Sequence, residues 1–191
     1  MTNPQQENPV DSDDLELAFQ LAGVGLCISR ERVIQRCNLA FGEMFGYVPE
    51  KLKGQSMACL YPTQDEYEHT GSRGLPVMQK TGSYSDERIM QRKDGTLFWC
   101  RVIGRSLYRD DPFACAVWSF EDISVKRPVR VKLTSREREV AQLLITGKSS
   151  KEIARTLSIS ARTVDAHRAR LIKKFDAKSA IDLISKIVGF S

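Results

Sequence analysis

The sequence predicts two folded units, an α+β domain with an antiparallel sheet followed by an all-α domain of four short helices. Three observations predict this division. The chain has 191 residues, which is enough for two small domains. Residues 12–123 combine helical and strand-like patterns, whereas residues 133–191 show helical spacing alone. Basic charge is also concentrated in the second unit.

The net charge changes sign near the boundary between the two predicted domains. Residues 130–191 contain 14 Lys and Arg against 6 Asp and Glu, a formal charge of +8, whereas residues 1–129 contain 15 against 18, a charge of −3. A basic domain attached to an acidic one indicates a polyanion as the partner of the basic domain. Residues 1–11 are polar and acidic, and we expect them to be disordered. Residues 124–132 are expected to form a short linker, interrupted by Pro128.

The first domain opens with an amphipathic helix. Its apolar residues recur at helical spacing: Leu15, Ala18, Phe19 and Ala22. Leu15 and Phe19 either pair with the same helix of a second chain or help to cap the sheet. Strands are then predicted at 24–29 and 32–36, helical segments at 39–45 and 49–52, and strands at 85–92, 97–107 and 113–120. This order is typical of an α+β domain with an antiparallel sheet.

The second domain contains two capping boxes, in each of which a Ser or Thr is followed three residues later by Glu. They lie at 134–137 and 149–152, and each precedes an apolar helical pattern. A tight turn at 158–159 leads to a third helix, from Ser160 to about Phe175, and a fourth helix covers about 179–188. Four short helices with this turn have the order of a helix-turn-helix unit with one extra helix.

The third helix has a face suited to the major groove of DNA. With Val164, Leu171 and Phe175 turned inward, the opposite face is small in the middle and cationic at its ends. That face consists of Arg162, Asp165, Ala166, Ala169 and Lys173. Small residues let the helix lie deep in the groove, where cations reach base edges or phosphates. Lys151 adds its charge to the free N–H groups that start the second helix. The alternative is an ordinary solvated face.

Residues 133–175 closely resemble the LuxR/GerE-type DNA-binding domain, whose stretches LTxRExEVL, GxxxKEIA and SxxTVxxHxxxIxxKL recur here in order. The resemblance implies a third helix that contacts the groove, with Lys151 and Thr163 near phosphates. The candidate DNA contacts are therefore Lys151, Arg162, Thr163, Asp165, Ala166, Arg168, Ala169 and Lys173. Asp165 can accept a hydrogen bond from cytosine but repels phosphate.

The same resemblance implies that the last helix pairs two subunits. Ile181, Ile184 and Ile187 are then candidate dimer contacts, and the alternative is that they pack in the core of the monomer. His167 occupies the histidine position of the family. It is interpreted as a packing or phosphate-contact residue rather than a metal ligand, because no second ligand is near it in the sequence.

The first domain resembles the PAS sensor fold. The stretches that carry this resemblance are 38–41 (NLAF), 45–47 (FGY), 52–54 (LKG), 92–95 (RKDG) with Phe98-Trp99, and 121–123 (EDI). The resemblance implies a sensory role and, in many such domains, a pocket for haem, flavin or a small metabolite.

The identity of any ligand stays unknown. Flavin photochemistry is disfavoured, because Cys59 in GQSMACL does not match the GxNCRFLQ stretch of photosensory domains. His69 is a candidate haem ligand, and the alternative is an ordinary exposed histidine. Cys100 and Val102 share one face of a strand with Gly104 and are candidate pocket residues, with core packing as the alternative for Cys100.

No catalytic or metal site is predicted. The sequence has no phosphate-binding Gly loop, and its only histidines are His69 and His167. Five cysteines without CxxC spacing argue against zinc and a disulfide framework. Without a signal peptide or an apolar span, the expected location is cytoplasmic, with no membrane partner. The first domain also does not resemble a phospho-acceptor domain.

Together these features predict a one-component transcription regulator that senses a signal in the PAS-like domain and binds double-stranded DNA as a homodimer. An unknown small ligand is a second expected partner, and RNA polymerase is a third candidate. One alternative is that the PAS-like domain only dimerises or docks a partner protein. Another is a haem or flavin enzyme with a DNA-binding tail.

Overall fold

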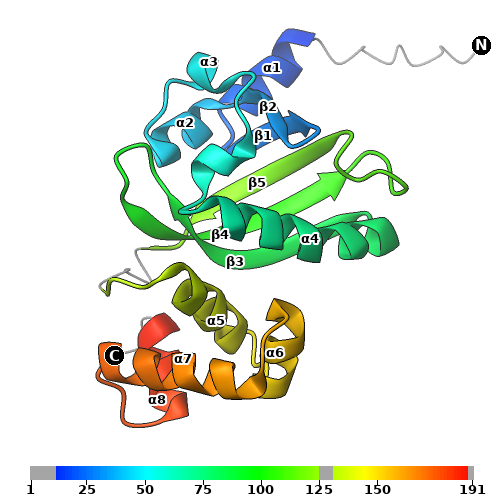
Figure 1. The fold of residues 1–191 in the computed structure, drawn as a ribbon. Helices are drawn as coiled ribbons and strands as arrows, with labels where there is room; N and C mark the ends of the chain where they lie inside the picture. The colour runs from blue at the N-terminus through cyan, green and yellow to red at the C-terminus, as the bar shows by residue number, and fades with distance from the viewer. Residues whose placement is uncertain (1–11, 125–130, 189–191) are drawn as a thin grey trace, which may run out of the picture.

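The computed structural model describes residues 12–124 and 131–188 and contains two domains (Figure 1). The N-terminal domain comprises α1 (Ser12–Gln20), β1 (Gly25–Arg30), β2 (Val33–Cys37), α2 (Leu39–Phe45), α3 (Pro49–Leu52), the 3-10 helix η1 (Met57–Leu60), α4 (Gln64–Thr81), β3 (Ser83–Gln91), β4 (Leu97–Ser106) and β5 (Ala116–Asp122). The C-terminal domain comprises α5 (Ser135–Ile145), α6 (Ser150–Leu157), α7 (Ala161–Lys174) and α8 (Ala180–Val188). The predicted fold class is confirmed. The segment predicted to be disordered, 1–11, and residues 125–130 of the predicted linker lie outside the described residues.

The sheet has the strand order β2-β1-β5-β4-β3, and every neighbouring pair is antiparallel. The chain builds the β1–β2 hairpin, leaves the sheet for the helices, and returns at the opposite edge with β3. Strand β5 then closes beside β1, with Cys27 opposite Trp118. The predicted strand at 113–120 begins only at Ala116. Phe113 instead belongs to a turn, where its carbonyl oxygen accepts a hydrogen bond from the Glu31 N–H.

Alternation along β4 separates two apolar clusters. Phe98, Cys100 and Val102 are buried on the face covered by the helices. There the Phe41 ring packs edge-on against Phe120, with ring centroids 5.0 Å apart. This cluster is the core of the N-terminal domain.

The odd-numbered residues face the other way, and Trp99 among them joins the apolar cluster of the C-terminal domain. Ile89 and Trp99 are cross-strand partners on β3 and β4, and both are buried. They belong to one apolar cluster with Leu133 and Val140, which is also the core of the helical domain. Figure 1 accordingly shows α5 lying along β3. The two domains therefore share a core at this edge of the sheet.

Helix α4 is the one long element that the apolar pattern does not predict. Gly71, Gly74 and Pro76 lower its helix propensity. Its N-terminal signal is nevertheless present, because Thr63 caps the helix and its hydroxyl donates to Glu66, three residues later. Packing explains Gly71: a Cβ there would lie only 2.5 Å from a side-chain nitrogen of Arg32, so the guanidinium would have to shift.

The helical domain forms as its capping boxes predict. Both boxes are complete, at Thr134 with Glu137 and at Ser149 with Glu152. Ser158 adopts a positive φ of 52°, and this residue ends α6 and starts the tight turn to α7. A core of Val140, Ile153, Val164, Leu171 and Leu183 then fixes the four helices against one another.

Candidate nucleic-acid interface and cavity

Helix α7 presents one face to solvent. Val164 and Leu171 are fully buried on its inner side. The opposite side carries residues that are all exposed: Arg162, Thr163, Asp165, Ala166, Ala169 and Lys173. Figure 1 places α7 on the far side of α5 from the sheet, so the N-terminal domain does not cover this face. An exposed basic face with small residues at its centre is the shape and charge that a major groove accepts.

Two of the predicted DNA contacts also connect α6 to α7. The Ser150 hydroxyl donates to Asp165 Oδ1 at 2.7 Å, and Arg168 Nη1 donates to the same hydroxyl at 2.7 Å. Arg168 is half-buried, with its guanidinium 3.9 Å from the Asp165 carboxylate. Asp165 and Arg168 therefore help to hold the angle between α6 and α7, in addition to the role predicted for them.

Lys151 and His167 differ in exposure. Lys151 is exposed in the first turn of α6, directly after the capping box. His167 is half-buried on α7, with Arg170 Nη1 at 3.5 Å from its Nδ1. Burial and the nearby Arg170 charge lower the pKa of His167. The imidazole is therefore neutral at pH 7, which favours packing over a charge contact with phosphate.

The residues proposed for dimer contacts differ in exposure. On α8, Ile187 is 3% exposed and packs with Leu183 in the domain core, whereas Ile181 is 81% exposed and Ile184 is intermediate. On α1, Leu15 is 60% exposed and Phe19 is half-buried beside Arg36. Helix α1 has no buried residue.

A small cavity, of which about 20 Å³ is accessible to a water-sized molecule, lies between α4, η1 and the inner face of the sheet. Apolar residues form much of its wall: Met57, Met78, Val102, Phe113, Trp118 and Phe120. Polar side chains line it from the turn after β1, from the end of η1, from α4 and from β3: Arg32, Tyr61, Tyr67, Thr70, Tyr84 and Arg88. Val102, a predicted pocket residue, is therefore part of this wall.

Cys100 and His69 do not line the cavity. Cys100 is fully buried in the domain core, where burial raises the pKa of its thiol to about 12. His69 lies on the outer side of α4, and its Nδ1 is 2.9 Å from Glu139 Oε1 in the other domain. Because His167 is on α7, neither histidine of the chain faces the cavity.

A hydrogen-bonded group extends from the cavity wall. Asp86 accepts hydrogen bonds from Arg88 Nε at 2.6 Å and from the Tyr84 hydroxyl at 2.8 Å. It also accepts one from Gln142 Nε2 of α5 at 2.9 Å. Arg88 Nη1 donates to the Tyr61 hydroxyl, and burial raises the pKa of Tyr61 so that this hydroxyl keeps its proton. Asp86 thus joins two residues of the cavity wall to the DNA-binding domain.

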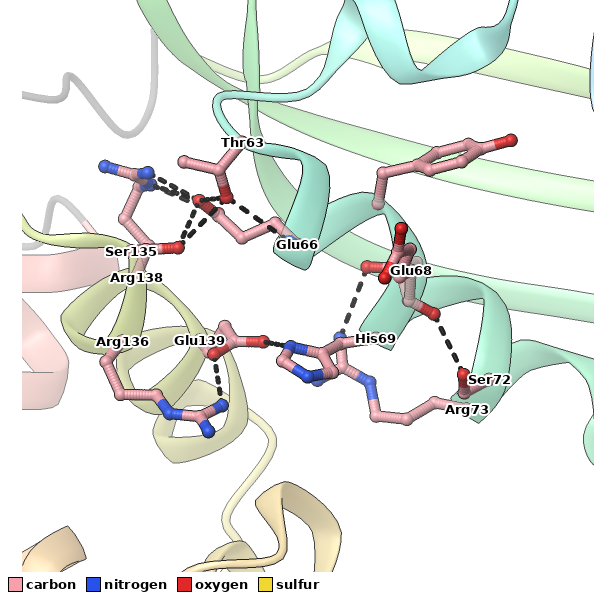
Figure 2. A network of polar contacts seen from close by, with 12 residues as sticks. Thr63, Glu66, Glu68, His69, Ser72, Arg73, Ser135, Arg136, Arg138 and Glu139 are labelled. Carbon is pink, nitrogen blue, oxygen red and sulfur yellow. Dashed lines mark hydrogen bonds and ion pairs between the residues drawn. The ribbon is translucent and has the colours of Figure 1, made fainter.

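A second polar group joins α4 to α5 (Figure 2). Glu66 accepts hydrogen bonds from Arg138 Nε, at 3.1 and 3.2 Å, and from the Ser135 hydroxyl at 2.9 Å. Arg138 Nη1 in turn donates to the Leu133 carbonyl oxygen at 2.7 Å. Both side chains of the pair are only 9% exposed. Glu139 contacts His69 and also accepts from Arg136 Nη1 at 2.7 Å.

These interdomain contacts are absent from the sequence prediction. Glu66, Arg138 and Glu139 have the composition of exposed helix residues, and no local pattern tells a buried charge from a solvated one. The capping position of Thr63 could have located the start of α4 and hence Glu66. Nothing in the local sequence pairs Glu66 with Arg138, 72 residues away.

The fold and the exposed face of α7 define a class of protein, a DNA-binding regulator with an α+β domain that holds a cavity. Comparisons with known families agree. Residues 131–187 match the family described as bacterial regulatory proteins, luxR family, and residues 22–125 match the PAS domain. The chain belongs to the PAS domain family through residues 22–125 and carries a C-terminal domain of the luxR family of bacterial regulatory proteins. The luxR family is a family of transcription regulators, which is not a class of enzymes.

Three known proteins show how far the similarity extends. The sensor protein TdiS of Thauera aromatica is 34% identical over 109 residues, which are 57% of this chain and 20% of TdiS. A PAS domain of a LuxR-family transcriptional regulator from Burkholderia thailandensis, solved in complex with ethanol, is 50% identical with a TM-score of 0.57. The match covers 58% of this chain and 98% of that domain. VqmA of Vibrio cholerae, solved as a dimer without its target DNA, is 23% identical with a TM-score of 0.56, over 94% of this chain and 89% of VqmA. At that identity VqmA shows a similar fold alone.

The chain spans only 20–44% of the length of the first curated relatives that it matches. Within residues 12–124 and 131–188, no helix is long and apolar enough to cross a membrane. In the same ranges, no group of three His, Cys, Asp or Glu side chains could hold a metal ion.

Proposed function

We propose that this protein is a ligand-responsive transcription regulator, in which occupancy of the PAS cavity changes how the C-terminal domain binds DNA. One observation carries the proposal: α4 lines the cavity with one face and contacts the DNA-binding domain with the other. Tyr67, Thr70 and Gly74 are on the cavity side. Glu66 and His69 are on the side that bonds to α5.

The wall between cavity and interface is thin. A second, smaller cavity, of which about 10 Å³ is accessible to a water-sized molecule, lies between α4, β3 and α5. Tyr61, Thr70 and Arg88 line both cavities. A ligand that moves any of these side chains therefore alters the surroundings of Gln142 and Arg138 on α5. Through these shared residues, a bound ligand would make different contacts in two arrangements of the docked domains. Such a difference in contacts is what lets a ligand shift the population from one arrangement to the other.

The docked arrangement leaves α7 open to solvent, so docking does not by itself block the DNA-binding face. We therefore propose that the signal acts on the relative placement of two helix-turn-helix domains in a homodimer. A dimer of this kind binds two half-sites about one helical turn apart. VqmA, which has a similar fold, has itself been solved as a dimer.

The alternative is a PAS domain that only dimerises or docks a partner. Two facts favour sensing over this alternative. The cavity has both apolar and polar walls, which is typical of ligand sites. A domain 50% identical to this one has been solved with ethanol.

A variant that fills the cavity tests the proposal. Gly74→Leu places a new side chain at the cavity wall, where a Cβ meets the Tyr84 ring at ordinary contact distance. Ser72→Leu adds the same side chain to the exposed side of α4 and is the matched control. The DNA would be a duplex selected from a random pool by the unmodified full-length protein. Its Kd would be measured by fluorescence anisotropy.

We expect Gly74→Leu to change the Kd by roughly 5- to 100-fold, the usual range of coupling between two sites, and Ser72→Leu to leave it unchanged. If folded Gly74→Leu binds the duplex as the unmodified protein does, the cavity is not coupled to DNA binding. If no duplex is selected at all, the DNA-binding assignment fails instead.

A further inference from the structure

The charged side chains that line the cavity are all positive. Two guanidinium groups, Arg32 and Arg88, line the cavity, and none of the residues that form its wall is Asp or Glu. The hydroxyls of Tyr61 and Thr70 add neutral hydrogen-bond donors. Arg88 is neutralised by Asp86, which lies behind it and also accepts from Tyr84. Arg32 therefore carries the uncompensated charge of the site.

Arg32 lacks an anionic partner of its own. Its guanidinium lies 3.5 Å from the centre of the Tyr67 ring, and its Nη2 donates to the Tyr67 carbonyl oxygen at 2.8 Å. No ion pair joins it to a carboxylate within residues 12–124 and 131–188. A half-buried guanidinium of this kind has N–H donors left over for another acceptor.

Two features of the backbone place Arg32 at the cavity. Glu31 and Arg32 both have positive φ, 50° and 59°, in the tight turn between β1 and β2, where Asn and Gly are the usual residues. Arg32 thus occupies a position that costs backbone energy. On the opposite side, the missing Cβ of Gly71 leaves the space in which the guanidinium lies against α4.

The remaining wall is apolar and includes the Trp118 and Phe120 side chains. We propose that the PAS cavity binds a small organic carboxylate, with the carboxylate on Arg32 and a compact apolar body against the inner face of the sheet. This inference rests on the proposed function, because it names the class of ligand that the cavity senses. Guanidinium groups bind carboxylates through paired hydrogen bonds, which strengthen where water is excluded.

Matched acids and alcohols test the charge requirement. Butanoate and 1-butanol, and benzoate and benzyl alcohol, would be titrated into the full-length protein by isothermal titration calorimetry. We expect at least one acid to bind about tenfold or more tightly than its alcohol, because only the acid can form charge-assisted hydrogen bonds. Equal affinity for acid and alcohol, or binding of neither acid, would overturn the proposal. The readout needs no DNA, so it is separate from the test of regulation.

Two variants assign the charge to Arg32. Arg32→Gln removes the guanidinium, and we expect the affinity for the acid to fall roughly 10- to 100-fold. Gly71→Ala keeps Arg32 but displaces its head, because the new Cβ would lie 2.5 Å from Arg32 Nη1. Alanine also favours the helix, so Gly71→Ala separates loss of binding from loss of folding. Arg30→Gln, exposed at the end of β1, is the matched control. Full affinity in both Arg32→Gln and Gly71→Ala would overturn the assignment.

Discussion

Glu66 and Arg138 form a buried ion pair that joins the PAS domain to the DNA-binding domain (Figure 2). Each belongs to a different domain, and each side chain is 9% exposed. Glu66 also accepts from Ser135, and Arg138 also donates to Leu133, so the pair is supported on both sides by further hydrogen bonds. A buried charge that loses its partner is costly, and this pair therefore specifies how the domains dock.

Removing one member of this pair is expected to loosen the docking. Glu66→Gln leaves the Arg138 charge buried and should lower the free energy of unfolding by about 3 kcal/mol, measured by urea denaturation. Glu68→Gln, exposed on the same helix, should leave it within about 0.5 kcal/mol. A change that small in Glu66→Gln would show that the pair does not hold the domains.

The stability of the helical domain is expected to depend on Glu137 at acid pH. Burial opposes ionisation of Glu137, but hydrogen bonds from Lys174 and Thr134 outweigh it and lower its pKa. Because the pKa of Glu137 is lower in the folded protein than in the unfolded one, ionised Glu137 stabilises the fold at pH values above the unfolded pKa of about 4.5. This stabilisation is lost as the pH falls through the folded pKa.

Lys174→Met tests the cause of that shift. Without the Lys174 charge, 2.6 Å from Glu137 Oε2, the pKa of Glu137 should rise. The part of the acid-induced loss of stability that comes from Glu137 should then become smaller, because its folded and unfolded pKa values lie closer together, as followed by denaturation between about pH 3 and pH 7. An unchanged pH profile would assign the acid sensitivity to other groups.

Gly104 is expected to be intolerant of any side chain. A Cβ there would lie 2.3 Å from the Trp118 ring, whose Nε1 donates to the Ser29 hydroxyl at 2.9 Å. Gly104→Ala should cost about 1–3 kcal/mol and alter the tryptophan fluorescence, because the ring must move. Gly23→Ala meets no atom within 4 Å and should be nearly neutral. Normal stability and fluorescence in Gly104→Ala would contradict this packing.

Two isoleucines of α8 are expected to respond differently. Ile187 is buried, so Ile187→Ala should lower the free energy of unfolding by about 2–4 kcal/mol. Ile181 is exposed, so Ile181→Ala should change stability by less than about 0.5 kcal/mol. If α8 pairs two chains, Ile181→Ala should also weaken self-association in sedimentation equilibrium. Unaltered association would leave Leu15 and Phe19 of α1 as the candidate contacts.

The basic surface is expected to contact phosphates. Lys151→Ala and Lys173→Ala should each weaken binding to duplexes of any sequence and reduce the salt slope of log K by about 1. Lys80→Ala, which is exposed on α4 of the other domain, is the control. Affinity and slope that match the unmodified protein in both variants would exclude the α6–α7 surface as the DNA contact.

Local chemistry explains which parts of this fold are predictable. The capping boxes at Thr134 and Ser149 and the bounds of α2 and α3 follow from neighbouring residues, and the structure has them where they were expected. Helix α4 was missed because Gly71 and Pro76 argue locally against a helix. The side chain that lies against Gly71 is Arg32, which comes from another part of the chain, so the reason for this glycine cannot be seen in the local sequence.

The candidate site likewise has one part that could be predicted from the sequence and one that could not. The basic face of α7 could be predicted because helical spacing alone assigns residues to a face. The cavity could not be predicted, since Arg32 lies in the turn between β1 and β2 and Arg88 lies in β3, and the two line one cavity only when the sheet has formed. Among the predicted pocket residues, Val102 lines the cavity, whereas Cys100 and His69 lie elsewhere.

The sequence by itself determined the two domains, their order and the basic face of the helix that we propose as the DNA contact, because spacing, capping and charge are properties of neighbouring residues. Only the tertiary structure decided that Glu66 meets Arg138, that Asp86 meets Gln142 and that α4 serves both the cavity and the interface. The physical reason is that burial of a polar side chain is set by whatever packs over it. Here that partner lies in the other domain, 56 or 72 residues along the chain.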